Sequence, residues 1–120
     1  MREERGNLAG DFTINETFTL WGSIAGKVTV VEGSKFYVRG AIYGNLSVEE
    51  GGRVHVLGNV SGNIYIKPGA KVVMGGNVGG DVINSGGRLF IEATASVLGR
   101  VKSYEGADTK AEPGCKVPLT

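Results

Sequence analysis

Three consecutive 18-residue blocks decide the fold: residues 18–35 (FTLWGSIAGKVTVVEGSK), 36–53 (FYVRGAIYGNLSVEEGGR) and 54–71 (VHVLGNVSGNIYIKPGAK). They align without a gap, with apolar residues at positions 1, 3, 7, 11 and 13 and glycine at positions 5, 9 and 16. Side chains of a strand alternate between faces, so the odd positions share one face. The pattern excludes helix and predicts an extended ribbon that brings the same face inward every 18 residues.

Such a ribbon is an all-β, single-stranded parallel β-helix, of about six coils with a triangular cross-section, because each block has two glycine bends and one turn. The block at 72–88 is one residue short, and the next accepts two extra residues around Ala93 and Thr94. Residues 6–14 read like 58–66, so the chain is expected to start partway through a coil. The predicted units are a charged extension (1–5), the β-helix (6–106) and a tail or partial terminal coil (107–120).

The period of 18 also suits a left-handed hexapeptide helix. Two observations favour a right-handed helix: apolar positions 3 and 11 exceed the hexapeptide rule, and parallel crossovers are overwhelmingly right-handed. The glycines at positions 5 and 9 are expected to face inward, where a side chain would collide with the opposite wall. Gly33, Gly51, Gly69 and Gly86 are expected to be turn glycines with positive φ.

The formal net charge of +1 excludes a global field that would attract nucleic acid, and no apolar run indicates membrane association. The start of the chain does not resemble a signal peptide, and Cys115 is the only cysteine. These features predict a cytoplasmic protein.

The sequence offers no catalytic constellation, so we expect no enzyme activity, no cofactor and no metal site. His55, the only histidine, lies at outward position 2 and is expected to be a surface residue. The stretch from 75 to 80 (GGNVGG) lacks the GK[ST] of a phosphate loop, and its glycines repeat in phase with the coils. Outward amides such as Asn59 and Asn77 are expected to form hydrogen-bonded rows along the rod.

The outward side of the first strand of each coil is a candidate lateral interface. Its positions 2 and 4 carry Trp21, Tyr37, Arg39, Leu57, Val73 and Phe90. Aromatic residues and arginine are typical anchors of protein interfaces, although exposed strands also tolerate aromatics for their β-propensity. This surface would bind another protein or a second filament.

Blocks such as residues 58–72 (GNVSGNIYIKPGAKV), repeated from Gly6 to about Gly106, resemble the bactofilins, bacterial polymer-forming cytoskeletal proteins. The resemblance implies a right-handed β-helix that assembles through its ends without nucleotide and acts as a scaffold, with symmetric head-to-head and tail-to-tail contacts. The alternative is a monomeric or dimeric β-helical binding module, an adaptor or inhibitor that acts through the lateral face.

The ends of the β-helix are the predicted self-assembly sites, because open strands must be capped or paired. The candidate end-contact residues are Leu8, Phe12, Ile14, Val117 and Leu119. Residues 112–117 (EPGCKV) resemble 67–72 (KPGAKV), which would place Val117 at position 1 of another coil. The repeat at the N-terminal end begins near position 5, so the last partial coil of one subunit would be continued by the first partial coil of the next. Head-to-tail joints, symmetric joints, and a tail that caps the core remain the three alternatives.

Overall fold

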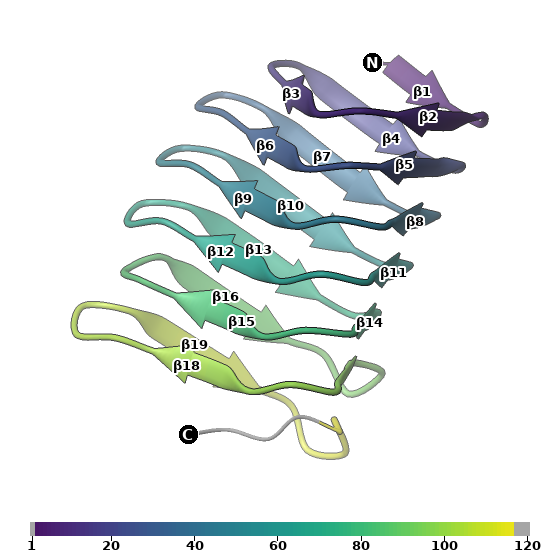
Figure 1. The fold of residues 1–120 in the computed structure, drawn as a ribbon. Coiled ribbons are helices and arrows are strands. Elements are labelled where there is room, and N and C mark those ends of the chain that lie inside the picture. Colours follow the sequence, from purple (N-terminus) through teal and green to yellow (C-terminus); the bar gives the residue numbers. More distant parts are fainter. Residues whose placement is uncertain (1, 117–120) are drawn as a thin grey trace.

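The computed structural model describes residues 2–116, and within that range all nineteen regular elements are β-strands in three parallel sheets (Figure 1). Sheet A contains β1 (Arg2–Glu4), β4 (Thr17–Leu20), β7 (Lys35–Val38), β10 (Arg53–Val56), β13 (Lys71–Met74), β16 (Arg88–Ile91) and β19 (Asp108–Ala111). Sheet B contains β2 (Asn7–Ala9), β5 (Ser23–Ala25), β8 (Ala41–Ile42), β11 (Asn59–Val60), β14 (Asn77–Val78) and β17 (Ser96–Val97). Sheet C contains β3 (Phe12–Ile14), β6 (Val28–Val30), β9 (Leu46–Val48), β12 (Ile64–Ile66), β15 (Val82–Asn84) and β18 (Val101–Ser103).

The strand register confirms the predicted parallel β-helix of about six three-sided coils. Phe36 pairs with Val54, and Val54 pairs with Val72, so equivalent residues of the 18-residue repeat lie side by side. In Figure 1 the chain runs leftward along the near wall and rightward along the far wall while it descends from the N-terminus, which is a right-handed path.

The core is a column of stacked apolar rows, as the odd positions of the repeat predict. Five residues in each of rows 1, 3 and 7 are buried: Phe18, Phe36, Val54, Val72 and Leu89; Leu20, Val38, Val56, Met74 and Ile91; Ile24, Ile42, Val60, Val78 and Val97. Rows 11 and 13 add Val28, Leu46, Ile64, Val82 and Val101, and Ile14, Val30, Val48 and Ile66. Phe12 and Leu8, at the N-terminal end, are only partly buried against this column.

The bend glycines are required for a different reason from the predicted one. A Cβ built at Gly58 would collide with the carbonyl oxygen of Gly40 in the preceding coil, and the same collision joins Gly76 to Gly58. A side chain at a bend would therefore collide with the neighbouring coil, because the Cβ direction there runs along the helix axis. The predicted collision with the opposite wall is wrong. The turn glycines are confirmed, with φ of 80° at Gly33 and 79° at Gly51.

The N-terminal boundary differs from the prediction. Arg2 pairs with Phe18 and Glu4 with Leu20, so residues 2–4 form the first strand of sheet A instead of an extension. The first coil thus starts at position 1 of the repeat. It is shorter than the others, because Arg2 and its equivalent Phe18 are sixteen residues apart. Strand β1 reads Arg-Glu-Glu and has no apolar side chain, so the apolar pattern does not indicate it.

The C-terminal phase also differs. Strand β19 occupies 108–111, and Lys116 bridges to Ser96 in sheet B, which places Lys116 at position 6 instead of position 18. The EPGC stretch is a turn between sheets A and B, with the Cys115 amide donating to the Glu112 carbonyl, and it matches the turn that Glu92 and Ala95 close one coil earlier. The predicted phase complementarity of the two ends is therefore wrong. Val117 and Leu119 themselves lie outside the described residues.

Asn84 replaces the apolar residue of row 13 and is fully buried. Its carbonyl oxygen accepts from the Gly87 amide at 2.8 Å, and its amide donates to Thr109 Oγ1 at 3.0 Å. The side chain thus connects strand β19 to the turn after β15, in the block that is one residue short. Both polar atoms of its amide have hydrogen-bond partners, as burial requires.

The axial collision at the bends predicts that even one methyl group is not tolerated there. Gly58→Ala should lower the free energy of unfolding by about 3 kcal/mol or more, because the opposing atom belongs to the backbone and cannot move aside. Urea unfolding followed by circular dichroism measures the loss. Ser61→Ala, an exposed control in the same coil, should change it by less than about 0.5 kcal/mol. Equal stability of the two variants would contradict the bend geometry.

Candidate protein-interaction site

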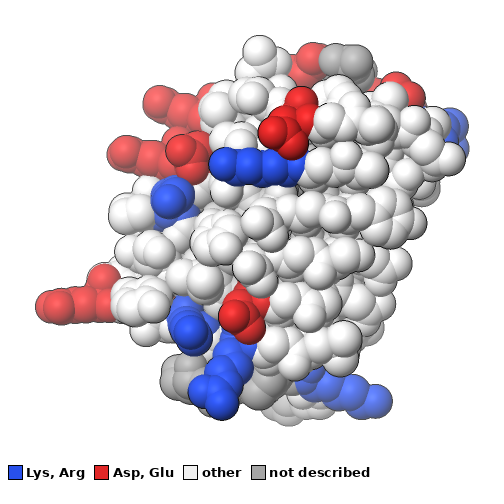
Figure 2. Space-filling model, in the orientation of Figure 1, with Lys and Arg blue, Asp and Glu red and all other residues white. Residues whose placement is uncertain are grey.

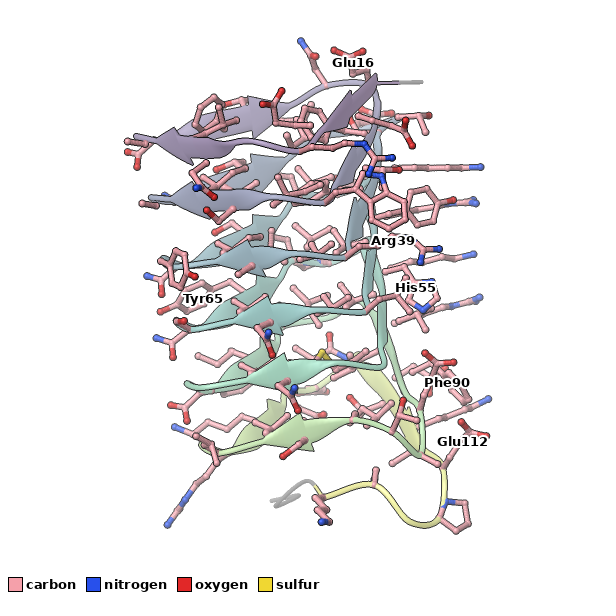
Figure 3. All side chains as sticks on the ribbon, turned by 90° about the vertical axis from the view of Figure 1, so that its right-hand side faces the viewer. Glu16, Arg39, His55, Tyr65, Phe90 and Glu112 are labelled. Atoms are coloured by element: carbon pink, nitrogen blue, oxygen red, sulfur yellow. The ribbon has the colours of Figure 1, made fainter. Side chains whose placement is uncertain are left out.

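The outer face of sheet A carries the residues that were predicted to form a lateral interface. Arg39, His55 and Phe90 project from the same wall, on the opposite side from Tyr65 of sheet C (Figure 3). Trp21 and Phe90 are each 40% exposed and Leu57 is 38% exposed. Arg39 is exposed, whereas Tyr37 and Val73 are half-buried between neighbouring rows. The structure therefore brings the six predicted residues onto one surface.

Trp21 is held in place by groups that the sequence pattern did not connect to it. The guanidinium groups of Arg5 and Arg39 lie 5.0 and 4.9 Å from its ring centroid. Its Nε1 donates to Glu3 Oε1 at 3.2 Å. Arg5 and Glu3 reach this site because β1 is part of sheet A. These contacts fix the indole orientation, which reduces the entropy lost when it binds a partner.

His55 is part of a polar cluster on the same face. Its Nε2 lies 3.1 Å from Glu92 Oε1, and its ring is 6.4 Å from that of Tyr37. Both members of the His55–Glu92 pair are about one-third exposed. Between residues 2 and 116, no group of three His, Cys, Asp or Glu side chains lies close enough to hold a metal ion.

A row of cations borders this face, and the sequence reasoning missed it. Lys35 pairs in register with Arg53, Arg53 with Lys71, and Lys71 with Arg88. The available signal was the basic last residue of four consecutive repeat blocks. Neighbouring strands are ~4.8 Å apart, so four positive charges follow one another along the rod. The His55–Glu92 ion pair of the described chain does not involve these four side chains, and Asp108 lies in register beside Arg88.

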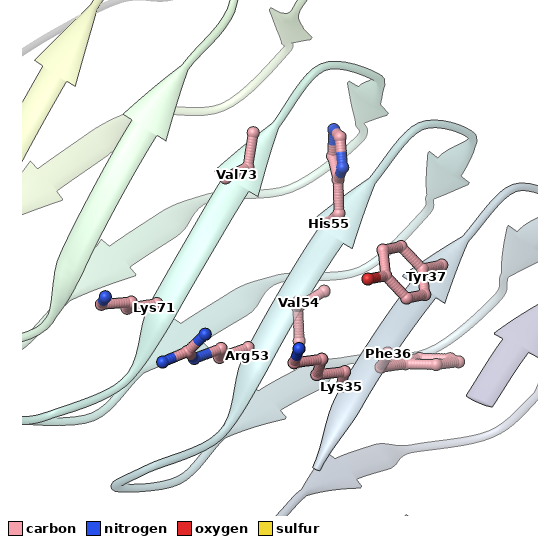
Figure 4. A pocket seen from close by; sticks show the side chains of 8 residues that line it. All are labelled: Lys35, Phe36, Tyr37, Arg53, Val54, His55, Lys71 and Val73. Carbon is pink, nitrogen blue, oxygen red and sulfur yellow. The ribbon is translucent and has the colours of Figure 1, made fainter. Parts of the chain in front are cut away.

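The cation row and the aromatic row enclose a shallow hollow of about 280 Å³ (Figure 4). Lys35, Arg53 and Lys71 line one side, and Tyr37, His55 and Val73 line the other. Lys110 extends the positive charge at the C-terminal end of the row that contains Phe90. The part of the face from Lys35 to Arg88 therefore combines apolar contact area with positive charge, which favours an acidic partner surface, while Glu3, Glu92 and Asp108 lie around it.

The two ends of the solenoid are the second candidate site. Strands β1, β2 and β3 are each paired on one side only, and no described segment lies beyond them in Figure 1. Leu8 and Phe12 are partly exposed there, while Ile14 is buried. At the other end, β18 and β19 are the last strands of their sheets, and Cys115 packs partly buried against the core.

No helix within the described chain is long and apolar enough to cross a membrane. Comparisons with known proteins give no match to this chain: no family model, no curated protein and no solved structure resembles it significantly.

The in-register cation row predicts a gain in stability when one charge is removed. Like charges directly opposite on neighbouring strands destabilise a sheet by roughly 0.2–1 kcal/mol per pair. Arg53→Gln, which relieves repulsion from Lys35 and Lys71, should raise the unfolding free energy at low salt, and the gain should shrink in 0.5 M NaCl. Arg39→Gln, which removes a contact with Trp21, is the control that should not stabilise the protein. A lower free energy of unfolding for Arg53→Gln would contradict the predicted repulsion, because it would mean that the Arg53 side chain makes a stabilising contact.

Proposed function

We propose that this protein is a structural scaffold that self-assembles through the ends of its β-helix, without nucleotide, as the repeat's resemblance to the bactofilins implies. The observation that carries the proposal is the pair of solenoid ends in the described part of the chain, where β1, β2 and β3 at one end, and β18 and β19 at the other, have no described partner strand on their outer side. A reducing, cytoplasmic location fits the single cysteine.

The N-terminal edge supports the proposal because two of its three strands lack protection. Natural edge strands avoid association through charge, proline, bulges or a covering segment. Strand β2 (Asn7–Ala9) and strand β3 (Phe12–Ile14) contain neither a charged residue nor proline. Only β1 contains charged residues, Arg2, Glu3 and Glu4. A second copy that paired with β2 and β3 would also cover Leu8 and Phe12.

The backbone pattern of β3 allows the edge to be tested without damage to the fold. The Phe12 amide donates to Lys27, and the Ile14 carbonyl accepts from Val31, so both residues face β6. Backbone groups of successive strand residues point to opposite edges, which directs the Thr13 amide toward the free edge. Proline at position 13 therefore removes an edge donor and no internal hydrogen bond.

Thr13→Pro should abolish long assemblies while circular dichroism and the melting transition stay close to those of the parent protein. Electron microscopy and sedimentation velocity provide the measurement, and Thr13→Val, which keeps the amide, is the matched control. Residual tail-to-tail pairs would indicate symmetric joints, and isolated subunits would indicate head-to-tail joints. Unchanged filaments from a folded Thr13→Pro protein would remove this edge from the mechanism.

The alternative function, a binding module that acts through sheet A, is favoured by one specific observation, the in-register cation row beside Tyr37 and Phe90. An acidic protein surface is the partner that this row would recognise.

Poly-glutamate serves as a probe of that surface. It should bind with an affinity that falls as salt rises, and the double variant Arg53→Glu and Lys71→Glu should lose about tenfold or more in affinity. The double variant Arg100→Glu and Lys102→Glu, on the sheet C side of the rod, is the charge-matched control. Equal loss for the control would mean that only net charge matters and that sheet A is not a site.

A further inference from the structure

The outer face of sheet B is uncharged over six coils. Its two outward rows consist of Asn7, Ser23, Ala41, Asn59, Asn77 and Ser96, and of Ala9, Ala25, Tyr43, Ser61, Gly79 and Leu98. The first charged residue in these rows is Lys116, at the C-terminal end. Figure 2 shows the surface over β5, β8, β11 and β14 as a continuous area without Lys, Arg, Asp or Glu. Charge lies on the flanking rows, where the chain bends away from this face.

Two protruding side chains and a hollow give this face its relief. Leu98 is 82% exposed and Tyr43 is 62% exposed, the highest values among the large apolar side chains of the described chain. Between them lies a hollow of about 500 Å³, with Ser61 and Gly79 as the small residues of its row. The Asn77 amide donates to Asn59 Oδ1 at 2.9 Å beside it.

The hollow is built into the backbone. A Cβ at Gly79 would lie 2.8 Å from the Ser61 carbonyl oxygen, so a side chain at this position would require the backbone to shift. The uncharged surface thus carries two exposed apolar side chains, Tyr43 and Leu98, with a hollow between them. Exposed apolar side chains of this size are not needed for solubility and are typical of an interaction surface.

We propose that sheet B is an interface with a second copy of this chain, packed face to face and antiparallel about a two-fold axis that passes at Ser61. The occupant is identified by self-complementarity, because this register places every large residue of the row opposite a small one. Tyr43 then faces Gly79 of the second copy, Leu98 faces Ala25, and Ser61 faces its own equivalent. In the adjacent row Asn59 faces itself, Ser23 faces Ser96, and Asn7 faces Lys116. Facing sheets pack ~10 Å apart, which side chains of these sizes can fill.

Other arrangements satisfy the surface less well. A parallel pair about an axis along the rod would place the hollow opposite the hollow of the second copy and leave both empty. Pairing through sheet A would bring two cation rows together. The outer rows of sheet C include Lys27, Asp81 and Arg100, so that face is charged. Sheet B is thus the face on which two copies meet without like-charge repulsion.

This interface does not depend on end-to-end assembly, since a face that runs along the rod is free in a single subunit and in a filament. If the ends polymerise, sheet B joins two antiparallel filaments. If they do not, sheet B yields a dimer. The width or mass of the assembly therefore reports on sheet B, and its length reports on the ends.

A charge placed on the two-fold axis tests the proposal. Ser61→Lys and Ser61→Asp, each alone, should weaken lateral pairing by about tenfold or more, because identical charges meet across the axis. An equimolar mixture of the two variants should restore it. Sedimentation equilibrium and filament width in electron micrographs are the readouts, with circular dichroism as the control for folding. Unchanged pairing in either folded variant, or no recovery in the mixture, would overturn the proposal.

The register is tested by cross-linking in a Cys115→Ser background. Ser23→Cys and Ser96→Cys proteins, when mixed and treated with a short bismaleimide, should cross-link to each other, and neither should cross-link to itself. Self-cross-linking of Ser23→Cys would instead indicate the parallel arrangement. The absence of cross-links in the mixture would contradict the antiparallel register.

Discussion

The close axial approach of successive coils at the glycine bends is the constraint on which the rest of this structure depends. Where Gly58 lies over Gly40, no side chain separates the two backbones. The coils can therefore stack at the spacing that parallel strand pairing requires, and three sheets extend without interruption. The same stacking aligns equivalent residues into rows, so any property repeated at one position becomes a continuous stripe along the rod.

Most of the fold could be predicted because the repeat combines two independent signals. Alternation at the odd positions identifies the inward face, and glycine at constant spacing identifies the bends. The prediction failed where a strand lacks the apolar pattern: β1 consists of charged residues and is recognised only by its pairing with Phe18 and Leu20. It also failed at the EPGC stretch, because the local sequence of a turn does not state which two sheets it connects.

The candidate surfaces could be predicted only in part. Phase alone places Trp21, Tyr37 and Phe90 on one outer face, but the contacts of Trp21 with Arg5 and Glu3 depend on the unrecognised strand β1. The cation row and the relief around Tyr43 and Leu98 arise from residues 17 to 19 apart, each unremarkable in its own block. Such features are absent from any single block and arise only from the alignment of outward positions between coils.

The central claim is that this rod associates with copies of itself. Sedimentation velocity of the unmodified protein, over a range of concentrations and with no nucleotide or divalent cation present, tests it most directly. We expect the weight-average mass to rise with concentration well beyond the 12.5 kDa of one chain. A single 12.5 kDa species at every concentration would contradict it.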